Sequence, residues 1–135
     1  MTTPDPAGYY EEKPMPTSRP STADRPPRAV LAMHRDLPAR LIDAHTMARL
    51  TALTDIDPAV VLDDFTTPAA RQVLAEVEVI VSGWGCPPID ADTLAAAPRL
   101  RAVVHAAGSV KCHVSVACWE RGIEVASVAW ANALP

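Results

Sequence analysis

The chain has 135 residues, of which 49% are hydrophobic and 21% charged, and its formal net charge is −4. This length suits one domain, and an acidic balance without a basic stripe argues against a nucleic-acid partner. No apolar run reaches the roughly 18 residues of a membrane helix, and the N-terminus lacks a signal-peptide pattern. Because three cysteines do not suggest a disulfide framework, we expect a cytoplasmic protein without membrane contact.

Residues 1–28 differ from the rest of the chain in composition and in hydrophobic pattern. They contain seven of the fourteen prolines and show no apolar periodicity. Such a composition cannot bury enough apolar surface to offset the cost of ordering the backbone. We therefore predict a disordered tail over residues 1–28 and a folded segment over residues 29–135.

Short β-branched strands and amphipathic helices alternate from residue 28 onward. Thr67 and Pro68 suit the start of a helix, Asp90 or Asp92 the start of the next, and Gly122 a left-handed helix end. The strands are apolar on both faces, which predicts a parallel sheet with helices on both sides. In chain order, we expect strands within 28–33, 59–65, 77–85, 101–108 and 123–130, and helices within 38–53, 67–77, 90–100 and 115–122.

Small residues follow the fourth predicted strand. Ala106, Ala107, Gly108 and Ser109 stand where this strand turns toward a helix, and ligands of such sheets bind beyond the carboxyl ends of the strands. Successive backbone N–H groups in a turn of this kind can bind a carboxylate or a phosphate. The alternative is a tight turn that needs small residues only for packing.

A large aromatic ring lies in the loop after the third predicted strand. The segment SGWGCPP places Trp84 between Gly83 and Gly85, and the two glycines permit an unusual backbone path. Trp84 is either an apolar wall of a ligand pocket or a cap on the edge of the core.

Histidines and cysteines near the same strand end are candidates for metal binding or acid–base chemistry. Cys112, His113 and Cys118 match no common zinc spacing and lack a fourth ligand, so we expect buried structural cysteines and no metal. His105 is either an acid–base group at the sheet edge or a hydrogen-bonded structural residue. His34 and His45 show no partner pattern.

The sequence contains no G-x-G-x-x-G, no G-x-x-x-x-G-K-[ST] and no G-x-S-x-G segment. No dinucleotide-binding fingerprint can be built from the five glycines, which are Gly8, Gly83, Gly85, Gly108 and Gly122. A hydride-transfer site therefore cannot be completed within these residues.

Residues 77–135 resemble the NAD-dependent D-2-hydroxyacid dehydrogenases, in the N-terminal part of their substrate domain. The resemblance depends on the run from Asp92 to Leu100, a strand, a small-residue turn, and the segment from Glu120 to Val125. It is weaker over residues 28–76. It implies a flavodoxin-like α/β fold with a five-stranded parallel sheet, helices on both faces, and further segments needed to complete the domain.

The resemblance also implies roles for particular residues. Ala107, Gly108 and Ser109 match a turn that usually reads Gly-Val-Gly, whose backbone amides hold the substrate carboxylate. Trp84 would form a pocket wall. Some members carry Arg at the position of Ser82, and its replacement here argues against a phosphorylated substrate. Asn132 matches an Asn at the crossing between two domains.

The implied reaction of the complete enzyme is hydride exchange between NAD or NADP and a 2-hydroxy or 2-oxo acid, in a homodimer. The family's cofactor domain and catalytic residues would follow Pro135. We therefore expect this chain to bind no cofactor and to be inactive alone. The alternative is a non-catalytic module that binds a small acid or a protein.

Overall fold

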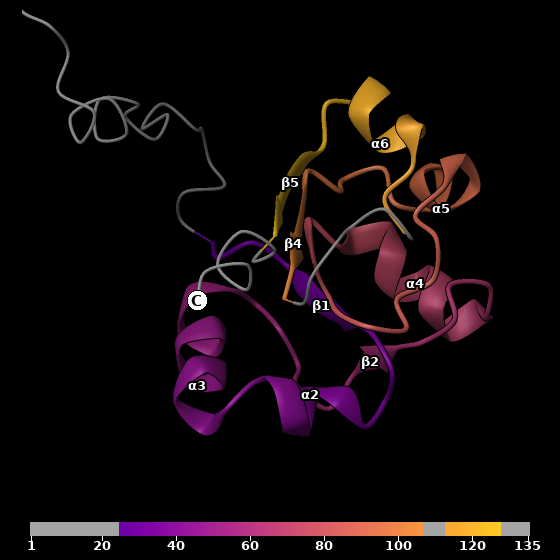
Figure 1. The fold of residues 1–135 in the computed structure, drawn as a ribbon. Coiled ribbons are helices and arrows are strands. Elements are labelled where there is room, and N and C mark those ends of the chain that lie inside the picture. Colours follow the sequence, from indigo (N-terminus) through magenta and orange to yellow (C-terminus); the bar gives the residue numbers. More distant parts are fainter. Residues whose placement is uncertain (1–24, 107–112, 128–135) are drawn as a thin grey trace, which may run out of the picture.

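The computed structural model describes residues 25–106 and 113–127, which contain a five-stranded parallel sheet (Figure 1). The strand order is β2-β1-β3-β4-β5, which is the flavodoxin-like order. The predicted fold class is therefore confirmed, while residues 1–24 of the predicted tail lie outside the described residues. The strands are β1 Ala29–Ala32, β2 Val61–Leu62, β3 Val79–Ser82, β4 Ala102–His105 and β5 Glu124–Ser127.

Helices cover both faces of the sheet, as Figure 1 shows. The connection from β1 to β2 carries its helices on one face, and the three later connections place theirs on the other. None of the described helices is long and apolar enough to cross a bilayer. The first pair is α2 Leu37–Leu41 and α3 Ala44–Leu53; the others are α4 Pro68–Glu76, α5 Ala91–Ala96 and α6 Val116–Glu120.

The prediction of one helix over residues 38–53 is wrong, because the structure divides this stretch into α2 and α3. The chain is extended at Ile42 and Asp43, and the Asp43 carboxylate accepts a hydrogen bond from Thr46 N at 2.7 Å. Asp43 thus caps a new helix. The apolar spacing continues across the break, which concealed it in the sequence.

Other predicted helix ends are confirmed. The Thr67 hydroxyl accepts from Ala70 N at 3.1 Å and Pro68 begins α4, while Asp90 accepts from Thr93 N at 3.0 Å. Gly122 follows α6 with a φ of 79°, in the region that favours glycine.

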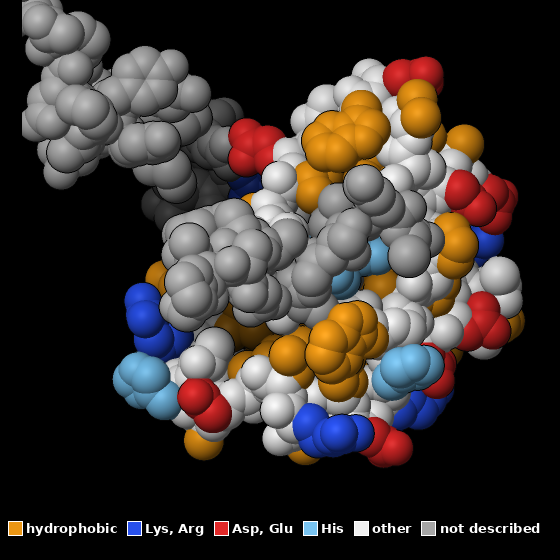
Figure 2. Space-filling model, in the orientation of Figure 1, with side chains coloured by type: hydrophobic (Ala, Val, Ile, Leu, Met, Phe, Trp, Pro, Cys, Tyr) orange, Lys and Arg blue, Asp and Glu red, His pale blue; other side chains and the backbone are white. Residues whose placement is uncertain are grey.

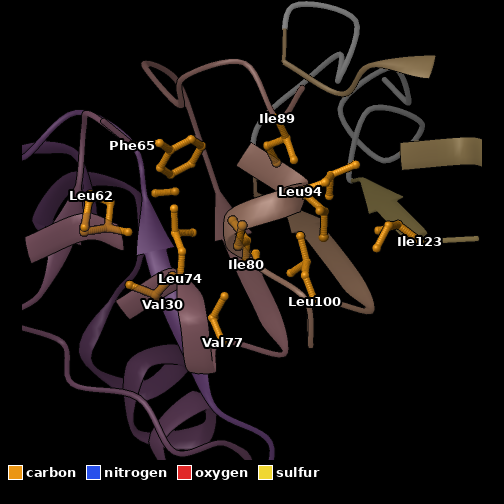
Figure 3. Packing of buried hydrophobic residues seen from close by; sticks show 14 of the residues in the cluster. Val30, Leu62, Phe65, Leu74, Val77, Ile80, Ile89, Leu94, Leu100 and Ile123 are labelled. Atoms are coloured by element: carbon orange, nitrogen blue, oxygen red, sulfur yellow. The ribbon is translucent and has the colours of Figure 1, made fainter. Parts of the chain in front are cut away.

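Each face of the sheet has its own apolar core. The larger one lies between the sheet and α4, α5 and α6, and Figure 3 shows its packing. The smaller one joins Leu31, Met33 and Val81 to Leu37 of α2 and to half-buried residues of α3. On this second face Val104 of β4 is 42% exposed, so the helices cover β1 and β3 more fully than β4.

The first described residues contact the amino end of β3. Arg28 N donates to Glu78 Oε2 at 2.9 Å, and Arg25 forms an ion pair with the same carboxylate at 3.4 Å. Pro27 O accepts from Asp55 N at 2.8 Å. Residues 25–28 therefore adjoin the sheet.

Arg121 closes the carboxyl end of α5. Its guanidinium donates to the carbonyl oxygens of Leu94 at 2.7 Å, Ala97 at 2.6 Å and Leu100 at 3.2 Å. Leu94 O and Ala97 O also accept from the backbone N–H groups of Ala97 and Leu100. Arg121 therefore adds a charged donor at the helix end, where a cation matches the helix dipole. Arg121 thus ties α6 to the end of α5.

We expect Arg121→Met to lower the free energy of unfolding by about 1–2 kcal/mol, because three carbonyl groups lose a charged donor. Urea unfolding followed by circular dichroism measures the change. The control is Arg99→Met, whose exposed ion pair with Glu76 spans 3.2 Å and should contribute less than about 0.5 kcal/mol. Equal losses in the two variants would contradict the capping role of Arg121.

Candidate binding site at the carboxyl edge of the sheet

Three strand ends meet in one row at the carboxyl edge of the sheet. Ser82 pairs with Ala32 on one side and with His105 on the other. Backbone hydrogen bonds continue just past this row, from Gly83 N to Ala32 O at 3.1 Å and from Ala106 N to Ser82 O at 2.7 Å. The loops that leave β3 and β4 therefore start from fixed positions.

Two residues of this row, Ser82 and His105, form a buried cluster with His113. Ser82 Oγ is 2.9 Å from His105 Nδ1 and 3.2 Å from His113 Nε2, and the two rings lie 4.4 Å apart between centroids. All three side chains are buried. His113 O also accepts from Ile89 N at 2.6 Å, which ties the cluster to the segment before α5.

The hydroxyl group of Ser82 couples the tautomers of the two rings. It has one proton to donate, so at least one of the two facing ring nitrogens must carry a proton and donate to Oγ. Burial lowers the pKa of His105. The pKa of His113 is lowered to about 4, mainly by burial and also by the charge interaction with His105. Both imidazoles are therefore neutral at pH 7.

This geometry suits a structural role, in which the cluster holds the strand ends in place, better than acid–base catalysis on a bound ligand. Neither ring is open to solvent, and the hydroxyl is enclosed between them. The structure thus favours the structural reading of His105 over the acid–base reading. His105 and His113 stand on either side of residues 106–112 in the chain, and both are anchored to one hydroxyl.

The loop Gly83–Gly85, at the same edge, lies on the face of the sheet that α2 covers. Trp84 O accepts from His34 N at 2.9 Å, which joins this loop to the end of β1. A Cβ at Gly85 would lie 2.5 Å from the His34 ring, and Gly85 has a φ of 86°. Glycine is required here by both the ring contact and the backbone.

A pocket of about 630 Å³ opens between this loop and α2. Its floor is apolar, because Leu37 is buried and Leu41 half-buried, and Trp84 is a 61% exposed wall. In Figure 2 the surface over α2 carries a hydrophobic group bordered by His and by Lys or Arg side chains. The lining residues are His34, Arg35, Asp36, Leu37, Arg40, Leu41 and Trp84.

Of the predicted site residues, Trp84 is placed at this pocket. Ala107, Gly108, Ser109 and Asn132 lie outside the described residues, so their roles stay predictions. Cys118 is buried in the larger core, where its thiol contacts Ile89 O at 3.3 Å. Within residues 25–106 and 113–127, no three His, Cys, Asp or Glu side chains are grouped as metal ligands.

Sequence reasoning did not place the Ser82 hydroxyl in a buried cluster, and it did not place His34 and Arg40 at a pocket. The strand register aligns Ser82 with His105, and a sequence does not display that register directly. The signal for His34 was its place just beyond an apolar strand, opposite a loop with two glycines. Arg40 resembles any exposed arginine until its surroundings are known.

A second hollow of about 360 Å³ lies near the amino ends of β1 and β2. Its rim is acidic, because Arg28, which pairs with Glu76 at 3.3 Å and approaches Asp55 at 3.8 Å, stands against three carboxylates, Asp55, Asp57 and Glu76. Ligands of such sheets bind at the opposite edge, so the pocket beside Trp84 is the stronger candidate.

The comparisons with known proteins identify the fold. The solved structures that resemble this chain include a phosphoglycerate oxidoreductase from Rhizobium etli, at 21% identity and a TM-score of 0.58, and one from Vibrio cholerae O395, at 22% and 0.53. The matches cover 76% and 75% of this chain but only 30% and 31% of those chains. No family model and no curated protein matches the sequence.

The neutral His pair predicts a pH dependence of stability. Because the folded-state pKa values are lowered, the contribution is complete above the unfolded value near 6.5 and is lost as pH falls toward 4. We expect urea unfolding to show a loss of about 1–2 kcal/mol across this window. His113→Gln should flatten the slope, whereas His45→Gln, an exposed site on α3, should not. An unchanged slope in His113→Gln would contradict the assignment.

The contact between Gly85 and His34 predicts a coupled effect of mutation. Gly85→Ala should cost about 2–3 kcal/mol of stability, because strain at positive φ adds to a clash with the ring. Gly122→Ala has a similar φ of 79° but no atom within 4 Å of the new Cβ, and should cost about 1 kcal/mol. In thermal melts, adding His34→Ala to Gly85→Ala should recover part of the lost stability, whereas adding it to Gly122→Ala should recover none. If the effects of His34→Ala and Gly85→Ala simply added, the clash would be contradicted.

Proposed function

We propose that this chain is part of the substrate domain of a D-2-hydroxyacid dehydrogenase and holds the carboxylate of a small 2-hydroxy or 2-oxo acid. The observation that carries the proposal is the place in the chain of the segment Ala107–Ser109, which the sequence predicts to be a turn. It directly follows β4 at the carboxyl edge of a sheet with flavodoxin-like strand order, where such folds bind ligands.

The surroundings of this turn support the proposal. Ala106 N is hydrogen-bonded to Ser82 O at 2.7 Å, and His105 and His113 are anchored to the Ser82 hydroxyl on either side of the turn. Fixed flanking residues lower the cost of ordering the segment between them around an anion. In this proposal the amides of Gly108 and Ser109 donate to the carboxylate, and Trp84 provides a pocket wall.

The redox step would belong to the complete enzyme. NAD or NADP supplies the hydride chemistry when bound, and the residues of this chain bind and orient the acid. The fold likeness to two phosphoglycerate oxidoreductases supports this class. A homodimer of the complete enzyme, an interdomain crossing at Asn132 and the absence of turnover by these 135 residues alone are parts of the same proposal.

We expect pyruvate to bind with a dissociation constant near 1 mM, about −4 kcal/mol, because two amides alone hold it. The measurement is a titration of the ¹⁵N-labelled chain, followed at the amides of Gly108 and Ser109. Ser109→Pro removes one donor and should abolish the shifts, whereas Ser109→Ala keeps the amide and should bind as the native chain does. Thermal melts establish that both variants fold.

Pyruvate binding that is unchanged in Ser109→Pro would overturn the site. The class is tested separately by the coding DNA beyond codon 135. An open frame that continues into a G-x-G-x-x-G segment after a strand supports the dehydrogenase, whereas a stop codon favours the non-catalytic acid-binding module.

A further inference from the structure

We propose that the pocket beside Trp84 binds the ring of a singly charged aromatic carboxylate, with Arg40 as the partner of the negative charge. This inference goes beyond the proposed function, because it assigns a second acid site at which Arg40, and not the amides of Gly108 and Ser109, holds the carboxylate. It depends on residues of β1, α2 and the loop Gly83–Gly85, all of which are described.

The shape and lining of the pocket fit a flat apolar group. A volume of about 630 Å³ falls within the usual range for small-molecule sites. Trp84 offers an exposed ring on one side, His34 a second ring, and Leu37 and Leu41 an apolar floor. An aromatic ring gains both apolar burial and ring contacts in such a place.

The loop that presents Trp84 is held in position. The hydrogen bond from His34 N to Trp84 O joins the two walls, and the His34 ring occupies the space that a side chain at position 85 would fill. Gly83 N is in turn bonded to Ala32 O. The exposure of Trp84 therefore results from a constrained backbone.

The charges around the pocket indicate the sign of the ligand. Arg35 is paired with Asp63 at 2.9 Å and is largely neutralised. The Arg40 side chain has no hydrogen bond or ion pair to any other described residue, so its guanidinium is free to bind a carboxylate.

The same charges limit the ligand to one negative charge. The Asp36 carboxylate also lines the pocket and does not cap α2 by a side-chain hydrogen bond. It would repel a second negative charge, so a phosphate or a dicarboxylate is disfavoured.

The test compares three ligands that share one ring. Phenylacetate is an anion, benzyl alcohol is neutral and phenethylamine is a cation. Each is titrated into the ¹⁵N-labelled chain and followed at the Trp84 indole and at the amides of residues 34–37 and 39–41. We expect phenylacetate to bind about fivefold more tightly than benzyl alcohol, and phenethylamine to bind most weakly. Equal affinities, or tightest binding by the amine, would overturn the proposal.

Matched variants locate the charge and the ring. Arg40→Leu should weaken phenylacetate about fivefold, whereas Arg49→Leu, an exposed site on α3, should not. Asp36→Asn should strengthen binding about twofold, because a nearby repulsion is removed. Trp84→Leu should abolish the indole-region shifts and weaken binding, while Trp119→Leu, 55% exposed on α6, should leave the affinity unchanged. Identical effects of Arg40→Leu and Arg49→Leu would also overturn the proposal.

The inference and the proposed function fail in different ways. Phenylacetate lacks the 2-oxo group, and its binding should survive Ser109→Pro, which is expected to abolish pyruvate binding. If pyruvate binds and phenylacetate does not, the proposed aromatic-acid pocket is wrong and the proposed carboxylate site at Gly108 and Ser109 stands. If phenylacetate binds and Ser109→Pro leaves pyruvate binding unchanged, the carboxylate site is wrong and the pocket stands.

Discussion

The parallel register of β3 between β1 and β4 is the constraint on which the candidate site depends. It places Ala32, Ser82 and His105 in one row, and the loops on both sides of that row begin from there. A shift of one residue would turn Ser82 to the opposite face and separate its hydroxyl from both histidines. The apolar cores enforce the register, because the same shift would exchange Ile80, which is fully buried under α4 and α5, with residues of the second face.

The two sides of this edge perform different physical tasks. On the side of α5, the buried cluster of Ser82, His105 and His113 holds strand ends together, and burial there favours the neutral form of the rings. On the side of α2, the next residues of the same strand open a pocket with an exposed tryptophan. The transition takes only Ser82 to Gly85, and the two glycines make it possible: Gly83 is crowded by Leu37 and Leu41, and Gly85 by His34.

The strand order, both helical layers and the caps at Thr67 and Asp90 could be predicted, because apolar periodicity and capping residues are local signals and the family resemblance supplied the order. The break at Asp43 was missed, since an aspartate inside an apolar repeat is also compatible with a continuous helix. The cluster around Ser82 required the cross-strand register, and the pocket required a loop conformation. Those features depend on contacts between distant segments, which composition and periodicity do not encode.

Ser82 also bears on the choice of ligand. Its hydroxyl lies 2.9 and 3.2 Å from two imidazole nitrogens in a fully buried site, so an arginine there would have to place its charge beside two neutral rings or displace them. Burying an unpaired guanidinium in such a place is costly. Among the described residues that line the pocket on this edge, the arginine without an ion-pair partner is Arg40 of α2. A site with its cation there, opposed by Asp36, is better matched to one carboxylate on an apolar ring than to a phosphate.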